Sequence, residues 1–330
     1  MNMTSQILMD EPENVRQYVE DVRNNPQSSL EEKNLSEEIE QAITLQEQGR
    51  NEEAIEAWQD IAADAEKIDN VVAASAWISV ASLLGEQGKH QEVIAASDKA
   101  IGLNPDLFAA YNNRGAGKGH LGRYEAAIKD FNEAIRLNPN HAGAYNNRGN
   151  ANASLGRHED AIADFDEAIR LKADDAEIYN NRGSVKAKFG LAEAAIGDYD
   201  QAIKLKRDYH EAFYNRGVVK AQLGLNQDAI ADYDMAINLN PDHAEAYSNR
   251  GAAKGMLGEH EVAIVDYDEA LRLKPVYPLA YYNRGLAHYA LANKETARQD
   301  FEKAHDLAHT SGNPALAALA EQMLQKIDEE

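Results

Sequence analysis

The sequence predicts an all-α protein built from stacked helical hairpins. Two observations carry this prediction: an internal repeat of 34 residues and, within each repeat, two helix-length segments separated by short turns rich in glycine or proline. A single hairpin of this size cannot bury its apolar face alone, so consecutive hairpins are expected to stack into a solenoid.

The repeat is visible as the motif Tyr-Asn-Asn-Arg-Gly. It begins at Tyr111 and returns, with small variations, at residues 145, 179, 213, 247 and 281. A second block, Ala-Ile-x-Asp-Tyr/Phe-x-x-Ala, follows in register, as in residues 161–168. The predicted units are 74–107, 108–141, 142–175, 176–209, 210–243, 244–277 and 278–311, preceded by a degenerate unit at 35–73 with five extra residues near 68–72.

Glycine and proline mark the expected helix ends. Glycine favours the left-handed conformation that closes a helix, and it is expected to end the first helix of each unit at 122, 156, 190, 224 and 258. Proline is expected to close the second helix at 105, 139, 241 and 275. Small residues such as Gly149 and Ala161 let the two helices approach, beside the aromatic Tyr145 and Phe165.

Both ends of the array resemble caps. Residues 1–34 are expected to form an acidic helical cap, with a short amphipathic helix stopped by Pro26 and a capping box at Ser29–Glu32. The short helix has an alternative role as a partner-docking helix. Residues 312–330 are expected to form a solvating final helix that begins at Asn313–Pro314.

The period and the residues resemble the tetratricopeptide repeat family, in the Tyr-Asn-Asn-Arg-Gly form common in bacterial and archaeal arrays. The match includes an aromatic residue at repeat position 4, Gly at 8, Leu-Gly at 14 and 15, Ala at 20 and an aromatic at 24. The resemblance implies a right-handed superhelix in which the first helices line a concave groove. It also implies a protein-interaction role in a bacterial cytoplasm.

Composition excludes several classes of function. The chain has no cysteine, which excludes disulfides, thiolate metal sites and a cysteine nucleophile. Its net charge of −23 argues against binding to nucleic acid or to an anionic membrane. A basic, apolar leader and a long apolar run are both missing from the sequence, so we expect a cytoplasmic protein.

The acidity is concentrated at the N-terminal end. Residues 1–73 hold 5 basic and 18 acidic residues, whereas residues 108–311 hold 25 and 30. A solvated surface explains this excess, and the alternative is an acidic dock for a basic partner.

Arginine and aspartate recur together at repeat positions 7 and 23. The six close repeats have both, as in Arg148 and Asp164, and the two divergent repeats have neither. This correlation predicts a bidentate ion pair between helices of one hairpin or of neighbouring ones, with an anion-binding stripe as the alternative. Lysines at position 11 either share these aspartates or remain solvated.

Asparagine recurs at position 6 of each close repeat. Its amide has both donors and an acceptor, which matches a peptide unit. The family resemblance places this position in the groove, and a similar ladder in the repeats of the O-linked N-acetylglucosamine transferase holds extended peptides. The implied peptide-binding residues are Asn113, Asn147, Asn181, Asn215, Asn249 and Asn283, together with Asn112, Asn146, Asn180, Tyr214 and Tyr282 at position 5. The alternative is that each asparagine bonds to a neighbouring helix or to water.

The groove positions change character along the array. They are rich in amides in the units from 108 to 209 and become aromatic and apolar towards residue 311. This gradient suits a partner segment that is polar and then apolar. Chaperone-binding relatives hold a C-terminal carboxylate with basic residues at positions such as 5. This chain has Asn or Tyr at position 5, so a C-terminal carboxylate is not expected as its ligand.

Catalytic residues, cofactor-binding residues and metal ligands are not expected. No phosphate-binding glycine motif occurs, and His305 and His309 lack the glutamate of a metalloprotease helix. The histidines at position 17, such as His90 and His260, are expected to be solvated turn residues.

The sequence therefore predicts a non-catalytic scaffold or adaptor in a hetero-complex, which binds an extended segment of a partner protein. The first alternative is a regulatory or inhibitory subunit that docks a folded enzyme or effector. The second is an RNA-binding solenoid, against which the acidity argues. A cryptic enzyme comes last.

Overall fold

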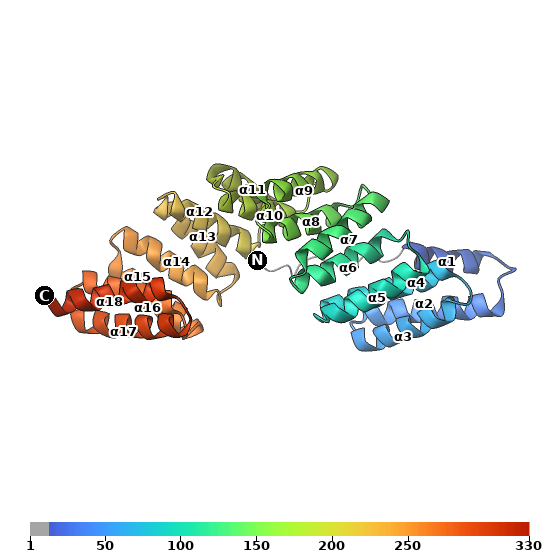
Figure 1. Ribbon diagram of the computed structural model, residues 1–330, viewed down its shortest axis with the longest axis horizontal. Helices are drawn as coiled ribbons and strands as arrows, with labels where there is room; N and C mark the ends of the chain where they lie inside the picture. Colours follow the sequence, from blue (N-terminus) through green and yellow to red (C-terminus); the bar gives the residue numbers. More distant parts are fainter. Residues whose placement is uncertain (1–12, 330) are drawn as a thin grey trace. The chain divides into compact units, whose positions relative to one another are not determined.

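A computed structural model describes residues 13–329 of the chain. Residues 1–12, which form the start of the predicted cap, lie outside the described residues, as does residue 330. Every regular element between residues 13 and 329 is a helix, and none is a strand (Figure 1). The predicted all-α tetratricopeptide solenoid is confirmed, whereas the division into eight units with two caps stays a prediction.

The chain consists of two compact units, Met1–Asp174 and Asp175–Glu330. The helices of the first unit run from blue to green in Figure 1. They are α1 (Glu13–Asn24), α2 (Leu30–Glu47), α3 (Asn51–Ala65), α4 (Asn70–Glu86), α5 (His90–Leu103), α6 (Phe108–His120), α7 (Tyr124–Leu137), α8 (Ala142–Ser154) and α9 (His158–Leu171).

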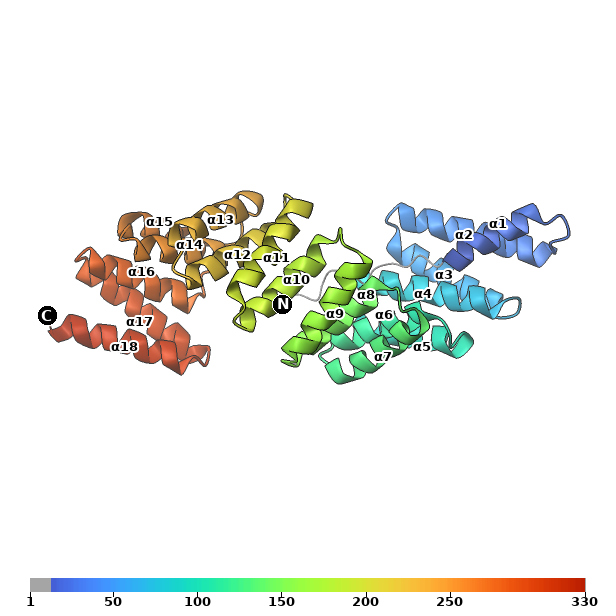
Figure 2. The same ribbon diagram turned by 90° about the horizontal axis from the view of Figure 1, so that it is seen from above.

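The second unit continues the alternation of first and second helices, which Figure 2 shows from above. They are α10 (Ala176–Lys188), α11 (Ala192–Leu205), α12 (His210–Gln222), α13 (Asn226–Leu239), α14 (Ala244–Met256), α15 (His260–Leu273), α16 (Pro278–Ala290), α17 (Lys294–Thr310) and α18 (Pro314–Glu329).

A left-handed residue separates the two helices of each close pair. Gly122, after α6, has a φ of 73°, a conformation that glycine adopts without a steric penalty. The same role falls to Ala292 after α16, with a φ of 60°. The predicted helix ends at glycine are therefore confirmed, and the last close pair uses a less favourable residue.

The close approach of the paired helices depends on glycine at position 8. A Cβ atom added at Gly149 would lie 2.9 Å from Cε1 of Phe165, a ring that is fully buried. Such a separation is shorter than van der Waals contact, so the ring fills the space that a side chain would need. Sequence spacing correctly predicts this pairing of glycine and aromatic ring.

The N-terminal helices enclose one continuous apolar core. The first helix, α1, packs against α2 and α4 and buries Val15 and Val19. At the start of α2, the Glu32 amide donates to Ser29 Oγ, and the Ser29 amide donates to the Glu32 carboxylate. The capping box is confirmed, and the apolar face of α1 is used within its own unit.

The final helix begins as predicted. The Leu316 amide donates to Asn313 Oδ1 over 3.2 Å, and Pro314 stands at the first helical position. Leu316 and Ile327 are buried. Leu319 is exposed, and the neighbouring Ala320 is buried in its place.

Candidate functional site

The first helices of successive pairs form one continuous row within each unit. In the first unit α4 contacts α6 and α6 contacts α8, and in the second unit α10, α12, α14 and α16 follow one another in the same way. The second helices of successive described pairs make no such contacts. The first-helix row is therefore the closely spaced side of each unit.

Arginines on the first helices bridge the gap between second helices. Arg148 on α8 donates through Nε and Nη2 to Asp164 on α9, over 3.1 and 2.6 Å. Its Nη1 donates over 2.7 Å to Oδ1 of Asn132 on the preceding second helix, α7. The predicted pair is confirmed, and the arginine reaches both its own hairpin and the preceding one.

The same fork recurs in every close repeat. Arg–Asp distances lie between 2.5 and 3.1 Å in the pairs 114–130, 182–198, 216–232, 250–266 and 284–300. Burial alone would lower the pKa of Arg284, but the hydrogen bonds that it donates to Asp300 and Asp268, with the charges of these carboxylates, outweigh burial and raise that pKa. The guanidinium stays charged, and its charge is used within the fold.

The position-11 residues complete these buried networks. Lys118 donates to Asp130 over 2.7 Å, and Lys220 and Lys254 contact their own aspartates in the same way. In α8 the place of the lysine is taken by Asn152, which donates to Asp164 over 3.0 Å. The sequence left two alternatives for these lysines, and the structure supports the one in which they share the aspartates.

The asparagine ladder joins successive first helices. Asn147 Nδ2 donates to Asn112 Oδ1 over 3.1 Å, and Asn215 Nδ2 donates to Asn180 Oδ1 over the same distance. Position 6 of one repeat thus bonds to position 5 of the preceding one. In Asn147 and Asn215, the Nδ2 half of the position-6 amide is used inside the fold.

The other half of these amides has no hydrogen-bond donor within the described chain. The Oδ1 atoms of Asn147, Asn215 and Asn249 accept no hydrogen bond there, and all three residues are half-buried. A carbonyl-type acceptor in this position suits the N–H of an extended peptide.

Burial separates the predicted site residues into two groups. Four are buried and present no amide at the surface: Asn112, Asn113, Asn146 and Asn180. Those that keep partial exposure are Asn147, Asn181, Asn215, Asn249, Asn283, Tyr214 and Tyr282. Position 5 is thus buried where it holds asparagine, and position 6 stays partly exposed except at Asn113, which the repeat pattern alone did not reveal.

Tyr214 takes the place of an asparagine in the ladder. Its Oη accepts a hydrogen bond from Asn249 Nδ2 over 3.2 Å. Burial, followed by the nearby Tyr277 and Glu245, raises the pKa of Tyr214 to about 12. The phenol therefore keeps its proton at neutral pH and retains a donor for a second partner.

The ladder is broken at its last step in the second unit. Position 5 of the preceding repeat is there the short side chain of Ser248, and no hydrogen bond joins it to Asn283. Within the described chain the Asn283 side chain makes no hydrogen bond. It lies instead at the edge of a pocket between α14, α15 and α16.

The histidines at position 17 differ from their predicted role. They begin the second helices and are half-buried, and the His90 ring stacks on His120 with centroids 4.2 Å apart. Burial, together with His90, lowers the pKa of His120. The expectation of solvated turn residues is wrong, because the first helix of the following pair packs against them, as α6 does against His90.

The described residues hold no group of three or more His, Asp or Glu that could bind a metal ion. His305 and His309 lie on one helix with ring centroids 6.4 Å apart. No described helix is both long and apolar enough to cross a membrane.

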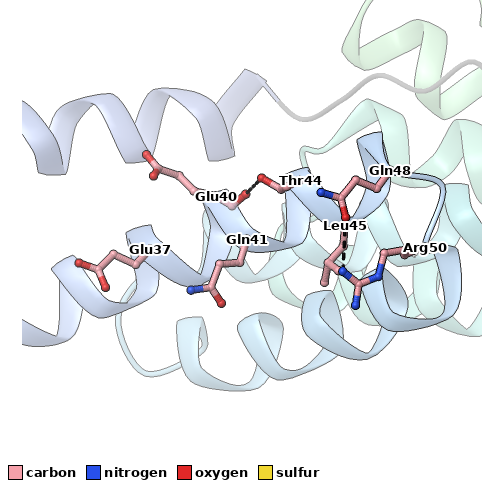
Figure 3. Close-up of a pocket in the computed structure, with 7 residues that line it drawn as sticks. All are labelled: Glu37, Glu40, Gln41, Thr44, Leu45, Gln48 and Arg50. Carbon is pink, nitrogen blue, oxygen red and sulfur yellow. Dashed lines mark hydrogen bonds between the residues drawn. The ribbon is translucent and has the colours of Figure 1, made fainter.

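The acidic N-terminal end has a shallow polar hollow of about 560 Å³ beside α2 (Figure 3). Glu37, Glu40 and Gln41 point from α2, and Arg50 approaches from the turn that follows. A second hollow, between α2 and α3, contains Glu38, whose pKa burial raises, aided by Asp64 and Asp60. Carboxylates therefore crowd this end of the first unit.

Sequence comparison identifies the repeats. Tetratricopeptide repeat profiles match residues 39–108, 120–176 and 279–308, and a further profile of this repeat matches 192–224, 221–258 and 256–291. Together these matches cover most of the chain, which belongs to the tetratricopeptide repeat family. This membership supports a role as a protein-interaction scaffold. A search of curated proteins gave no significant match.

Solved structures share the fold. The Cut9–Hcn1 hetero-tetramer of the APC/C matches 98% of this chain with a TM-score of 0.63 and 17% identity, and this chain spans 61% of the length of that one. Pseudomonas aeruginosa PilF matches 64% of this chain and 96% of its own, with a TM-score of 0.58 and 16% identity. A tetratricopeptide repeat protein from Parabacteroides merdae matches 75% and 98%, with a TM-score of 0.57 and 18% identity.

Proposed function

We propose that the protein is a non-catalytic interaction scaffold that binds an extended segment of a partner protein along its first-helix row. The supporting observation is the set of half-buried amide oxygens of Asn147, Asn215 and Asn249, which accept no hydrogen bond within the described chain. Each is held in place by the bond that its own Nδ2 makes, so little side-chain freedom is lost on binding.

The repeat spacing supports binding of a main chain rather than of one side chain. Equivalent acceptors recur once per repeat along adjoining helices, and each peptide unit offers the donor that such an acceptor needs. The arginines cannot supply a competing anion-binding stripe, because their forks are occupied by aspartates and by the preceding helix. The proposed partner is therefore a protein segment. We propose further that the complex forms in the cytoplasm.

The test is affinity capture from an extract of the source organism. The bait carries Asn215→Ala, Asn249→Ala and Asn283→Ala, and circular dichroism confirms that it is folded. A matched control removes three exposed amides of the second helices, with Gln227→Ala, Asn238→Ala and Gln299→Ala. We expect wild type and control to retain the same partner and the ladder variant to lose it. Equal retention by all three would contradict the proposal.

A second candidate is docking of a basic partner on the acidic end of the first unit. The observation in its favour is the crowding of Glu38, Asp60 and Asp64 around the hollow between α2 and α3. Deletion of residues 1–73 would expose the buried face of α4, so charge removal is the better test. Partner capture that is lost with Glu38→Gln, Asp60→Asn and Asp64→Asn, but kept by the ladder variant, would select this function.

A further inference from the structure

A pocket of about 230 Å³ lies between α14, α15 and α16. No Asp, Glu, Lys or Arg lines it, and its Met256 is 80% exposed. Its volume is below the range of pockets that hold a whole cofactor or drug-sized molecule, so it suits one side chain. The residues used below are Gly255, Met256, His260, Tyr267, Asn283 and Leu286.

Gly255 opens this pocket, and the fold itself does not require a glycine there. Gly251, one turn earlier, must be glycine because a Cβ atom would lie 3.0 Å from the Tyr267 ring. Gly258 ends the helix with a φ of 83°. Gly255 has neither constraint: a Cβ atom there would meet only Tyr267 Oη, at 4.0 Å.

Three of the other five close repeats have alanine at the position of Gly255, namely Ala153, Ala187 and Ala221, and the remaining two have Gly119 and Tyr289. Glycine within a helix is less favourable than alanine, so an unforced glycine costs stability. The empty space that it leaves in the pocket is the feature that distinguishes this repeat from those three.

The pocket is joined to the first-helix row by Asn283. The Asn283 side chain makes no hydrogen bond within the described chain, so both its donor and its acceptor are available. An amide with both functions matches a peptide unit on both sides. The pocket and Asn283 together therefore offer an apolar surface and hydrogen bonds to the same part of a peptide.

We infer that this pocket is the anchor site for an apolar side chain, of the size of Leu or Met, in the extended segment that the scaffold binds. The inference rests on the proposed function. The anchor side chain lies against Met256, Tyr267 and Leu286, and the peptide unit next to it bonds to Asn283. A charged anchor is excluded because it would be desolvated without a partner. Met256 adapts to the exact shape of the anchor because its thioether chain is flexible.

The test uses a library of randomised 12-residue peptides displayed on phage, selected on the full chain. Peptides that emerge are measured by fluorescence polarisation against wild type, Gly255→Leu and Asn283→Ala. Gly255→Ala is the matched control, since it adds one methyl group and leaves most of the pocket open. The Cβ atom at residue 255 has room, so the Leu and Ala variants are both expected to fold.

We expect the selected peptides to share a Leu, Met or Phe residue, and replacement of that residue by Ala to weaken binding roughly tenfold or more. Gly255→Leu removes this preference, so that the parent and Ala peptides bind it equally. Gly255→Ala retains the preference.

The outcomes distinguish failure of the anchor site from failure of the proposed function. Peptides that bind tightly with no shared apolar residue, or that bind Gly255→Leu as well as wild type, would overturn the anchor site and leave the proposed function standing. Enrichment of no peptide at all would overturn both.

Discussion

Two helix pairs of the first unit join their helices by different chemistry. In α4–α5, Val80 and Ala96 occupy positions 7 and 23 and are buried in one apolar cluster. In α8–α9, the same positions hold Arg148 and Asp164, joined by a two-pronged ion pair. The hairpin therefore does not require a charge at either position.

A second pair of positions shows the same exchange. Position 8 is Ala81 in α4 and Gly149 in α8, and position 24 is Ser97 in α5 and Phe165 in α9. In α8–α9 the Phe165 ring fills the space that Gly149 leaves, whereas α4–α5 has two small side chains at the same positions. The α8–α9 pair, with its charged residues, has in addition the hydrogen bond from Arg148 to Asn132, which joins this hairpin to the preceding one.

The largest expected effect comes from breaking one charged pair. Arg148→Val leaves the Asp164 carboxylate, whose side chain is 7% exposed, without its guanidinium. We expect the free energy of unfolding to fall by about 3 kcal/mol, because an unpaired buried charge is costly. Urea denaturation followed by circular dichroism measures the loss, and an unchanged midpoint would show that the pair does not stabilise the fold.

The next effect comes from adding a methyl group where the aromatic ring lies. Gly149→Ala places a Cβ atom 2.9 Å from Phe165, and we expect a loss of about 2 kcal/mol from overpacking. Gly102→Ala is the control, because its Cβ atom would meet nothing within 4 Å. The control is expected to keep or slightly raise the melting temperature; equal losses in both variants would argue against a packing role for glycine.

Transplanting the chemistry of α4–α5 into α8–α9 should restore most of the stability. The double variant Arg148→Val, Asp164→Ala removes both charges, and we expect it to unfold within about 1 kcal/mol of wild type. The double-mutant cycle gives the coupling free energy of the pair. Strictly additive losses would mean that the two residues act separately.

The smallest effect concerns the left-handed residue after α16. Ala292→Gly relieves the strain of a positive φ, 60°, at a position where the other close pairs have glycine. We expect a gain of about 0.5–1 kcal/mol, partly offset by the greater freedom of glycine in the unfolded chain. A rise in the melting temperature of the purified chain would show the gain, and a fall would mean that the alanine is not strained.

The sequence was sufficient to predict the helical hairpins, their turns and the pairing of Arg148 with Asp164, because each depends on residues at fixed spacing in one repeat. The hydrogen bond from Asn147 to Asn112 was harder to foresee, since it depends on how one repeat stacks on the next. Gly255 was a sequence signal for the pocket beside Asn283, because three other close repeats have alanine at this position. The open space itself depends on how three helices pack together.

The most direct test of the division between structural and binding ladders compares neighbouring residues of α14. The affinity of a peptide selected on the wild-type chain is measured for Asn249→Ala and for the double variant Arg250→Val, Asp266→Ala. We expect the asparagine variant to bind about fivefold more weakly, as for one lost hydrogen bond, and the double variant to bind within about twofold of wild type. An equal or greater loss in the double variant would contradict the account, because the charged ladder would then contact the partner.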